Sequence, residues 1–464
     1  MTHDLRCRSI AAVLAVAACA DPSAASDDAD ASTGSSEAGE SSTAASASTT
    51  APPPPTTTDD QSDDTGINCG DDDQDGFEPT QCGGADCDDF DPLTNPDVTH
   101  DGWEQLLLHP MPGGGFWRHH AWITGPDHLV DLFFAFNGMI IQIEQESEAL
   151  WDGGTQLALG AEPQVALAPD GGHHLVYVGF NADQTARGIF YTKVGSTEVQ
   201  TLEEVPIENP NPFGLDLAID PTTNKLHLVY GVLYEFPPTL RYATSDDGRA
   251  WNVETIDDDA AGFGATIVLD DAGVPFVSYS NNDDQVVLAT KPADVWSTRV
   301  VAMGYETVAT SIAREPDGDL HIAFAVSGLD DTDDGLHHVG MQDGAWGEPT
   351  EIDADAVWYD EIGAWDYRPA IVADAHAVHV AYHDYGAGAL RYAARIDGAW
   401  AKRVIDPGQG ELSTQAGWDP QLELADGELH IGESSQATNE YRHLVVIPDD
   451  GADNDCDGMI DEGP

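Results

Sequence analysis

The stretch KLHLVYG, Lys225 to Gly231, decides the fold, because variants of it recur along the whole second part of the chain. The variants are HHLVYVG, VPFVSYS, DLHIAFA, AVHVAYH, ELHIGES and DHLVDLFF. Six copies carry a histidine at one position and Pro275 occupies it in the remaining one; the histidines are His128, His174, His227, His321, His379 and His430. Successive positions are 46, 53, 48, 46, 58 and 51 residues apart, which indicates a repeated structural unit.

Each copy lies among three further strand-like segments. A short apolar segment such as LDLAIDP or ATIVLDD precedes it, and a third such as TLRYATS or ALRYAAR follows. The fourth opens with tryptophan, as in WNVETID, WSTRVVA, WGEPTEID and WAKRVID. Four short strands in about fifty residues, bounded by turn residues, are the unit of a β-propeller. The sequence therefore predicts an all-β fold with seven blades.

The last repeat lacks its own tryptophan-led strand. After His430 there is room only for YRHLVVI, whereas WEQLLLH, Trp103 to His109, fits the fourth-strand pattern and follows no blade. We predict that Trp103–His109 is the outer strand of the blade built from roughly 418 to 447, because a ring closed this way leaves no open sheet edge.

The N-terminus has the features of an export signal. Arg6 and Arg8 precede the short apolar run IAAVLAVAAC, which resembles a bacterial lipobox in which Cys19 would be lipidated. Ordinary cleavage near Ala18 or Ala20 is the alternative. Residues 20–66 consist mainly of Ser, Thr, Ala, Asp and Pro without an aromatic residue, which predicts a disordered linker.

The charge balance excludes one class of partner. The chain has 84 acidic and 17 basic residues, a formal net charge of −67, so it would repel nucleic acid and anionic lipid head groups. The same charge suits cation binding, a basic partner or solubility in a salty medium.

Acidic residues and cysteines cluster at both ends of the repeat array. Apart from Cys19 and the signal cysteine, four cysteines remain, which allow two disulfides in three pairings: Cys69, Cys82, Cys87 and Cys456. Three of them lie near the linker and one near the C-terminus, so at least one bridge should join the two ends. The candidate metal ligands are Asp71, Asp73, Asp75, Asp86, Asp88, Asp89, Asp91, Asp453, Asp455, Asp457 and Asp461. Alternate carboxylates before a glycine can face one hard cation, and an oxygen-only ligand set favours calcium.

These acidic runs resemble the two halves of the MopE-like metal-binding motif and also calcium-binding thrombospondin type 3 repeats. DCDDFDP, Asp86 to Pro92, fits the middle of the motif, and Asp453 to Gly463 fits its end. Asp449 stands where the family has a cysteine, and Cys69 lies upstream instead, which leaves the pairing open. The resemblance implies that the propeller is inserted into a disulfide-linked metal-binding clasp formed by both chain ends.

A second resemblance concerns the propeller. TSDDGRAW, Thr244 to Trp251, is similar to the Asp-box turn of sialidase-like propellers, where it is structural. A sialidase would need three convergent arginines and a Tyr–Glu pair; the candidates are Arg118, Arg314, Arg368, Tyr367 and Glu361. No Arg-Ile-Pro segment opens the first blade. The repeated histidine is interpreted as an inter-blade hydrogen-bonding residue, since one per blade cannot share a metal ion.

Aromatic residues in the loops before the inner strands are candidates for a ligand-binding mouth, with packing against the adjacent blade as the alternative. They are Trp117, Phe213, Phe263, Trp358, Trp365, Tyr367 and Trp418.

The expected organisation is a signal peptide (1–18), a lipidated linker (19–66), a first metal-binding half (67–101), the propeller (102–448) and a second metal-binding half (449–464). We expect a monomeric, lipid-anchored binding or scaffold protein of the bacterial cell envelope, exposed to the periplasm or cell exterior. Its partners would be an extracellular glycan or protein, calcium, and a membrane through the lipid only. The alternative is a carbohydrate-active enzyme of the sialidase-like propeller type; catalytic residues are not assigned.

Overall fold

The computed structural model describes residues 103–446 with internal gaps. The gaps are 111–119, 125–129, 137, 148–149, 152–153, 182–183, 207–212, 233–236, 261–263, 306, 327–334, 343, 357–367, 397, 409–414, 426–427 and 436–439. Among the described residues, no helix is long and apolar enough to cross a membrane.

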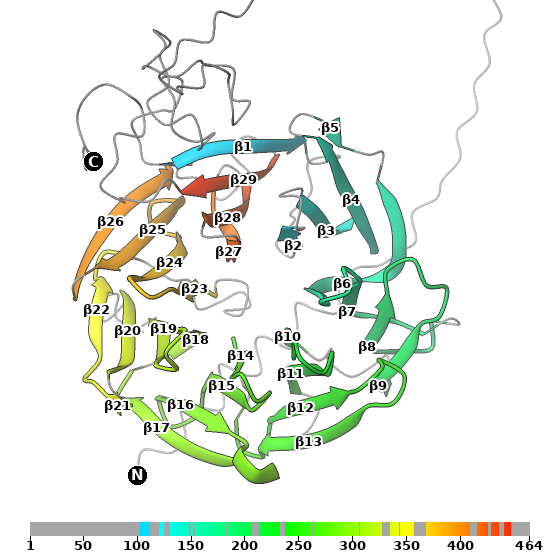
Figure 1. Ribbon diagram of the computed structural model, residues 1–464, viewed down its shortest axis with the longest axis horizontal. Coiled ribbons are helices and arrows are strands. Elements are labelled where there is room, and N and C mark those ends of the chain that lie inside the picture. The colour runs from blue at the N-terminus through cyan, green and yellow to red at the C-terminus, as the bar shows by residue number, and fades with distance from the viewer. Residues whose placement is uncertain are drawn as a thin grey trace, which may run out of the picture.

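The described chain is an all-β propeller whose strands surround a central axis (Figure 1). In three of the sheets, four strands that are consecutive in the sequence lie side by side in the same order. They are β10 (Phe213–Ile219), β11 (Leu226–Val232), β12 (Thr239–Ser245) and β13 (Asn252–Asp257); β14 (Thr266–Leu269), β15 (Pro275–Ser280), β16 (Gln285–Thr290) and β17 (Ser297–Met303); and β23 (Ala370–Ala373), β24 (Ala377–Asp384), β25 (Ala389–Ile396) and β26 (Ala399–Asp406). Each strand pairs antiparallel with the next. A fourth sheet contains β18 (Thr307–Arg314), β19 (Leu320–Val326), β20 (Gly335–Gln342), β21 (Ala345–Trp346) and β22 (Thr350–Asp353).

The first repeats are joined into one eight-stranded sheet. It contains β2 (His120–Thr124), β3 (Val130–Phe136), β4 (Met139–Ser147), β5 (Leu150–Trp151), β6 (Thr155–Leu167), β7 (His173–Phe180), β8 (Ala186–Lys193) and β9 (Gln200–Pro206). Strand β6 pairs through Thr155–Leu159 with β4 and through Gly160–Leu167 with β7. The described strands therefore form five separate sheets and this larger one, rather than the seven separate blades predicted. The cause is that β6 continues without a turn where the sequence suggested a break.

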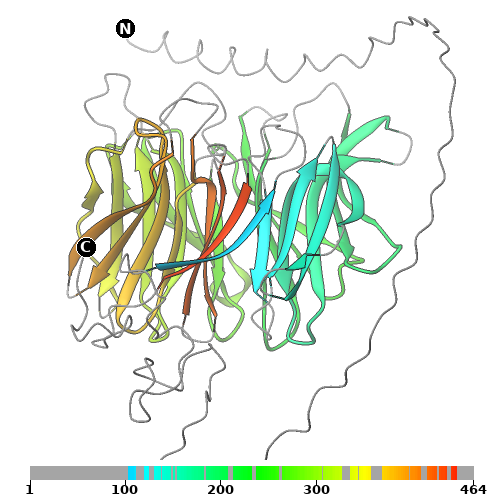
Figure 2. The same ribbon diagram turned by 90° about the horizontal axis from the view of Figure 1, so that it is seen from above.

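The N-terminal strand closes the ring, as predicted. Strand β1 (Trp103–Pro110) pairs antiparallel with β29 (Glu440–Val446), so that the sheet order is β1-β29-β28-β27. The other members are β28 (Glu428–Ser435) and β27 (Trp418–Ala425). Figure 2 shows β1 beside β29 at the outer side of this sheet. The last sheet is thus built from both ends of the described chain.

The core lies between neighbouring sheets. Leu226, Leu228 and Tyr230 of β11 are fully buried and pack in one cluster with Val176 and Val178 of β7. Both faces of such a strand are covered, which is why KLHLVYG is apolar almost without interruption. Apolar side chains buried between neighbouring sheets hold the strands around the axis.

Candidate functional site

The repeated histidines bond within their own sheets. Nδ1 of His227 in β11 forms a hydrogen bond of 2.6 Å with the hydroxyl of Tyr242 in β12. The corresponding pairs are His174–Tyr191 at 2.8 Å, His321–His338 at 3.0 Å, His379–Tyr392 at 2.6 Å and His430–His443 at 2.9 Å. The predicted inter-blade hydrogen bond is therefore wrong at these positions, because the partner lies on the next strand of the same sheet.

Strand register also corrects two of the aligned positions. In the antiparallel pair β10–β11, Ala218 and His227 form the last residue pair but one. In the pair β14–β15, Val268 and Phe276 occupy this position. Phe276, not Pro275, therefore corresponds to the histidine. In β3 the same register gives Asp131, while His128 lies outside the described residues.

Contact between sheets comes from the tryptophans that open the fourth strands. Trp296 packs edge-on against Tyr242, with ring centroids 5.0 Å apart, and Trp251 packs in the same way against Tyr191 at 5.7 Å. In each case the tryptophan belongs to the following sheet. The histidine thus orients an aromatic side chain that the next sheet covers, and this explains why His and Trp recur together.

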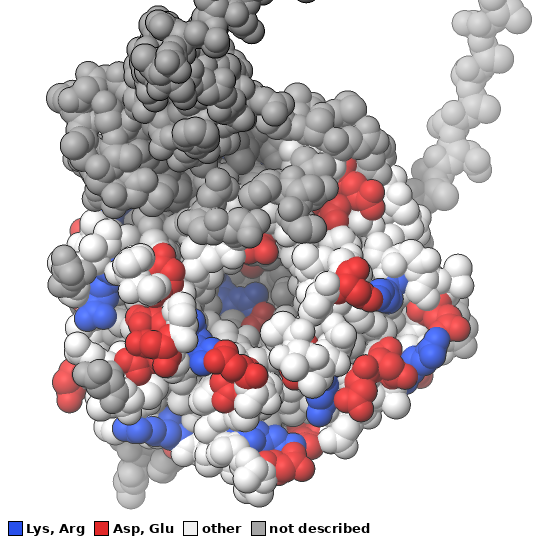
Figure 3. Space-filling model, viewed as in Figure 1, with Lys and Arg blue, Asp and Glu red and all other residues white. Residues whose placement is uncertain are grey.

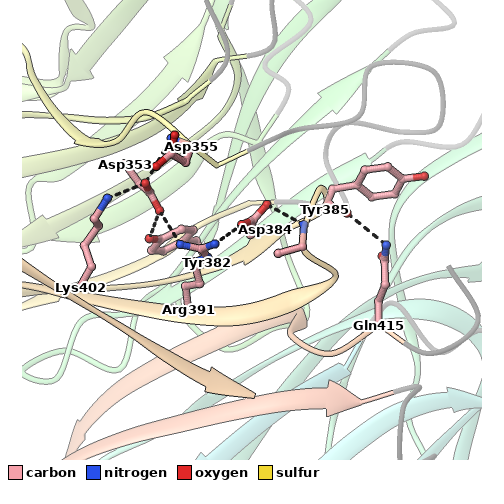
Figure 4. A network of polar contacts seen from close by, with 9 residues as sticks. Asp353, Asp355, Tyr382, Asp384, Tyr385, Arg391, Lys402 and Gln415 are labelled. Carbon is pink, nitrogen blue, oxygen red and sulfur yellow. Dashed lines mark hydrogen bonds and ion pairs between the residues drawn. The ribbon is translucent and has the colours of Figure 1, made fainter. Parts of the chain in front are cut away.

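Carboxylates at the ends of outer strands link neighbouring sheets (Figure 4). Asp353 of β22 is fully buried and accepts hydrogen bonds from Lys402 Nζ at 2.6 Å and the Tyr382 hydroxyl at 2.6 Å. Arg391 lies 3.4 Å from Asp353 and 2.8 Å from Asp384. Although burial acts to raise it, the pKa of Asp353 is lowered by the hydrogen bonds from Lys402 and Tyr382.

Similar carboxylate contacts recur around the ring. Glu203 of β9 accepts hydrogen bonds from Tyr230 at 2.5 Å and Arg241 at 2.6 Å. Asp257 accepts one from Tyr279 at 2.9 Å. Asp406 contacts Arg442 and accepts a hydrogen bond from Ser435. Each of these carboxylates accepts a hydrogen bond from a side chain of the following sheet, which marks them as structural links between sheets.

In β28, Glu433 occupies the position that Tyr230 has in β11 and Tyr382 in β24, opposite an arginine of the next strand. Its side chain is buried, its Oε2 accepts a 2.5 Å hydrogen bond from the Gly417 amide, and its Oε1 lies 3.6 Å from Arg442. Burial, and then the neighbouring Asp406, raises the pKa of Glu433 to about 8. A carboxyl group with this pKa is mostly protonated at neutral pH.

The face in Figure 3 is hollowed at its centre, where both basic and acidic side chains are visible. Asp216 of β10 belongs to an inner strand, and its Oδ2 accepts a 2.7 Å hydrogen bond from the Ile267 amide of β14. Gln421 bonds in the same way to the Trp122 amide at 3.1 Å. Burial raises the pKa of Asp216, and Arg368 opposes the rise. These polar side chains fasten one inner strand to the next.

The described arginines of the sialidase interpretation do not converge. Arg314 ends β18 and forms an ion pair with Asp271 at 3.0 Å, whereas Arg368 precedes β23 and interacts with Asp216. The two therefore lie at opposite ends of equivalent inner strands. Arg118, Glu361 and Tyr367 lie outside the described residues.

Trp418 is the one predicted mouth residue whose side chain is described. It is fully buried in a cluster with Tyr382 and stacks on His383, with ring centroids 4.7 Å apart. These contacts match the packing alternative for this position. The prediction for Phe213, which begins β10, concerns a side chain outside the described set, as do those for Trp117, Phe263, Trp358, Trp365 and Tyr367.

Cys19, the four other mature cysteines and all predicted calcium ligands also lie outside the described residues. Within the described part, no group of three or more His, Cys, Asp or Glu side chains is arranged to hold a metal ion.

A polar groove lies between sheet β10–β13 and sheet β14–β17. We call it the inter-sheet groove; its volume is about 570 Å³, and its lining includes Lys225, His227, Trp251, Glu254, Lys291 and Asp294. One wall is the TSDDGRAW turn, in which the Ser245 hydroxyl accepts a 2.9 Å hydrogen bond from the Gly248 amide. This supports the expectation that the turn is structural.

The opposite wall is held in an uncommon conformation. Lys291 bonds Glu254 at 2.9 Å and Asp294 at 2.8 Å, and its ammonium group lies 6.0 Å from the Tyr242 ring centre. In the same segment, Ala293 and Asp294 have φ values of 52° and 67°, a region that residues other than glycine seldom adopt. Such strain persists where surrounding contacts enforce it, often at binding sites.

Sequence patterns did not indicate this groove. Its lining comes from two sheets and four separate segments, so only the packing of β11 and β13 beside β15 and β16 brings the residues together. The one available signal was the TSDDGRAW turn, which predicted a fold element and not a cavity.

No family profile and no curated protein matches the chain. Among solved structures, an alpha-L-arabinofuranosidase of Fusarium graminearum in complex with arabinobiose is 10% identical, with a TM-score of 0.45 over 74% of this chain and 98% of that one. A fungal lectin from Aleuria aurantia with a six-bladed β-propeller fold and fucose recognition is 13% identical, with a TM-score of 0.40 over 66% and 99%. An intramolecular trans-sialidase from Ruminococcus gnavus is 11% identical, with a TM-score of 0.38 over 73% and 96%. These likenesses concern the fold alone.

Proposed function

We propose that the protein is a binding or scaffold propeller of the bacterial cell envelope that recognises an extracellular glycan or protein. The observation that carries the proposal is the inter-sheet groove. It combines an aromatic side chain, hydrogen-bond donors and acceptors, and two residues with positive φ. Binding sites are typically concave and contain a few convergent polar groups. A glycan is the ligand class we favour.

Binding is preferred to catalysis because the shifted carboxyl groups already have structural partners. Asp216 and Glu433 both have raised pKa values, yet each accepts a hydrogen bond from a backbone amide of a neighbouring segment. A glycosidase needs two carboxyl groups that flank one bond of its substrate. The separation of Arg314 from Arg368 gives the sialidase alternative no support among the described residues.

We further propose that the ring counts seven blades. The support is the divided pairing of β6, whose first part serves as the fourth strand beside β4 and whose second part serves as the inner strand beside β7. Counted in this way, the eight-stranded sheet contributes two blades to the five separate sheets. Just after the change of partner, Glu162 has a positive φ of 52° within the register shift between Ala161 and Gln164.

The chain ends are proposed to form a calcium- and disulfide-stabilised clasp, and Cys19 a lipid anchor. Trp103 pairs with Val446, so the segments that precede and follow the propeller start from neighbouring strand ends. The closeness of these two strand ends supports the proposal of one composite site. The protein would then be monomeric and attached to a membrane only through its lipid.

The function is tested by glycan-array binding with the mature soluble part of the chain, followed by incubation of each bound glycan and product analysis. We expect binding without cleavage. Asn252→Ala, which alters the exposed groove wall, should weaken binding, whereas Asn281→Ala outside the groove should not. Release of a sugar product at a rate proportional to protein concentration would establish the enzyme alternative instead.

A further inference from the structure

The inter-sheet groove contains two of the few lysines of a very acidic chain, beside the acidic side chains of Asp246, Glu254 and Asp294. Lys225 and Lys291 are two of only four lysines in the sequence, and both line the groove. Lys291 is held by Glu254 and Asp294, whereas Lys225 makes no ion pair within the described part of the chain. The Lys225 ammonium group is therefore available to a ligand.

His227, which also lines this groove, has a buried ring nitrogen. Its side chain is only 3% exposed, yet among the described residues Nε2 has no hydrogen-bond partner. The equivalent atom of His321 contacts Glu315 at 2.7 Å, and that of His379 contacts Asp374 at 3.4 Å. A buried polar atom without a partner is costly, so its retention here needs a reason.

The carboxylate that could have satisfied His227 is engaged elsewhere. Asp220 occupies the position of Glu315 and Asp374, directly after the inner strand. Its Oδ1 accepts a 2.8 Å hydrogen bond from the Thr222 amide, and its Oδ2 accepts a 2.5 Å hydrogen bond from the Thr223 hydroxyl. The local turn therefore leaves Nε2 of His227 without a partner among the described residues.

His227 is neutral at pH 7, so one of its ring nitrogens is a donor and the other an acceptor. Burial, and then the nearby Lys225, lowers the pKa of His227 to about 4, so the ring is neutral at pH 7. The Tyr242 hydroxyl lies 2.6 Å from Nδ1, and in the tautomer in which this hydroxyl donates, the ring proton resides on Nε2. In this tautomer the groove offers one N–H donor beside one ammonium group.

We propose that the inter-sheet groove binds a saccharide unit that carries a single carboxylate, whose oxygens accept hydrogen bonds from His227 Nε2 and Lys225 Nζ. This inference rests on the proposed binding function and adds the class of ligand. Asp246 and Glu254 would accept hydrogen bonds from the sugar hydroxyls, and Trp251 supplies apolar surface. An acidic peptide or other polyanion fits less well, because these carboxylates and the net charge of −67 would repel further negative groups.

The test uses the mature soluble protein with 15N-labelled histidine, titrated with glucuronate, glucose and acetate at pH 7 and followed by NMR. Glucuronate should shift the His227 Nε2 resonance and bind at least roughly tenfold more tightly than glucose or acetate, because only it joins the carboxylate to the hydroxyl pattern. The other repeated histidines should not shift.

Matched variants separate the ligand contact from a structural role. His227→Phe should weaken glucuronate binding roughly tenfold, and the site should tolerate it because Phe276 occupies the equivalent position in β15. His379→Phe, in which the lost Nε2 contact is to Asp374, is the control and should bind normally. Lys225→Gln should also weaken binding, whereas Lys193→Gln, which loses the surface pair with Asp170, should not.

Glucuronate binding that is equal in wild type and His227→Phe would overturn the inference, as would a preference for glucose or acetate. If glucuronate fails to bind while an array glycan does, the ligand class is wrong and the binding function stands. If no glycan or protein ligand binds and a sugar is cleaved, the proposed function itself fails.

Discussion

Trp103 and Val446 lie opposite each other in the antiparallel pair β1–β29, so the first and last described residues of the propeller are neighbours. The pairing continues to Pro110 and Glu440 with one register shift between Gln105 and Leu107. Closure by the N-terminal strand covers the edge of β29, which would otherwise be open to pairing with another chain. The ring is thus held by contacts between the two ends of the sequence.

Closure predicts a local response to loss of the C-terminal segment. Deleting 449–464 should remove the proposed clasp and increase amide hydrogen exchange in 103–110 and 440–446, while 226–232 stays protected. A mass-spectrometric map of the oxidised protein should link Cys456 to Cys69, Cys82 or Cys87. A free Cys456, or full protection of both strands in the truncated protein, would contradict the clasp.

Calcium should stabilise the protein through the acidic end segments. Adding calcium should raise the Tm and a chelator should lower it, because a ligand that binds only the folded state stabilises that state. Differential scanning fluorimetry measures the shift, and Asp455→Asn should reduce it. Tight copper binding without a response to calcium would reverse the choice of ion.

Lipidation at Cys19 should determine where the protein resides. The wild type should partition into the detergent phase with the membrane fraction, and Cys19→Ala should release it, because the lipid on Cys19 is the only proposed attachment to the membrane. Immunoblotting of fractionated cells measures the distribution. A fully soluble wild type would end the lipoprotein proposal.

Asp353 should be essential for the contact between its two sheets. Asp353→Asn removes the charge that pairs with Lys402 and Arg391, and we expect a loss of about 3 kcal/mol in the free energy of unfolding. Denaturant unfolding measures this loss. The neighbouring exposed Asp355→Asn is the control and should change stability little; equal effects would argue against the buried link.

Glu433 should make stability depend on pH. The pKa of Glu433 is about 8 in the folded protein, against 4.5 for a glutamate in the unfolded chain. The stabilisation from its protonated form is therefore fully present below pH 4.5. This contribution is lost as the pH rises through 8, by roughly a few kcal/mol in total. Glu433→Gln should flatten the decline in the free energy of unfolding between pH 5 and 8; a decline that is unchanged in this variant would contradict the assignment.

Most of the ring could be predicted from the sequence because its signals are local. The tryptophan-led segments appear as fourth strands at Asn252–Asp257, Ser297–Met303 and Ala399–Asp406, and WEQLLLH forms the closing strand. The continuity of β6 could not be predicted, since it depends on which neighbour each half of one strand pairs with. For the same reason the histidine–tyrosine bonds within sheets needed the strand register.

The candidate site was less accessible to sequence reasoning. The inter-sheet groove depends on contacts between β11, β13, β15 and β16, and on the engagement of Asp220 by Thr223. Nothing in the spacing of Lys225 and Lys291 shows that they share a cavity. The predicted aromatic mouth lies mostly outside the described residues, and its one described side chain, Trp418, is part of the core.

Amide hydrogen exchange with and without a glycan that binds on the array tests most directly that the propeller is a binding module with its site in the inter-sheet groove. The account predicts added protection at 225–227, 244–254, 273–275 and 291–294, the segments that line the groove, with the glycan recovered intact. Protection confined to the inner strands 213–219 and 418–425 would place the ligand in the central hollow and contradict the account.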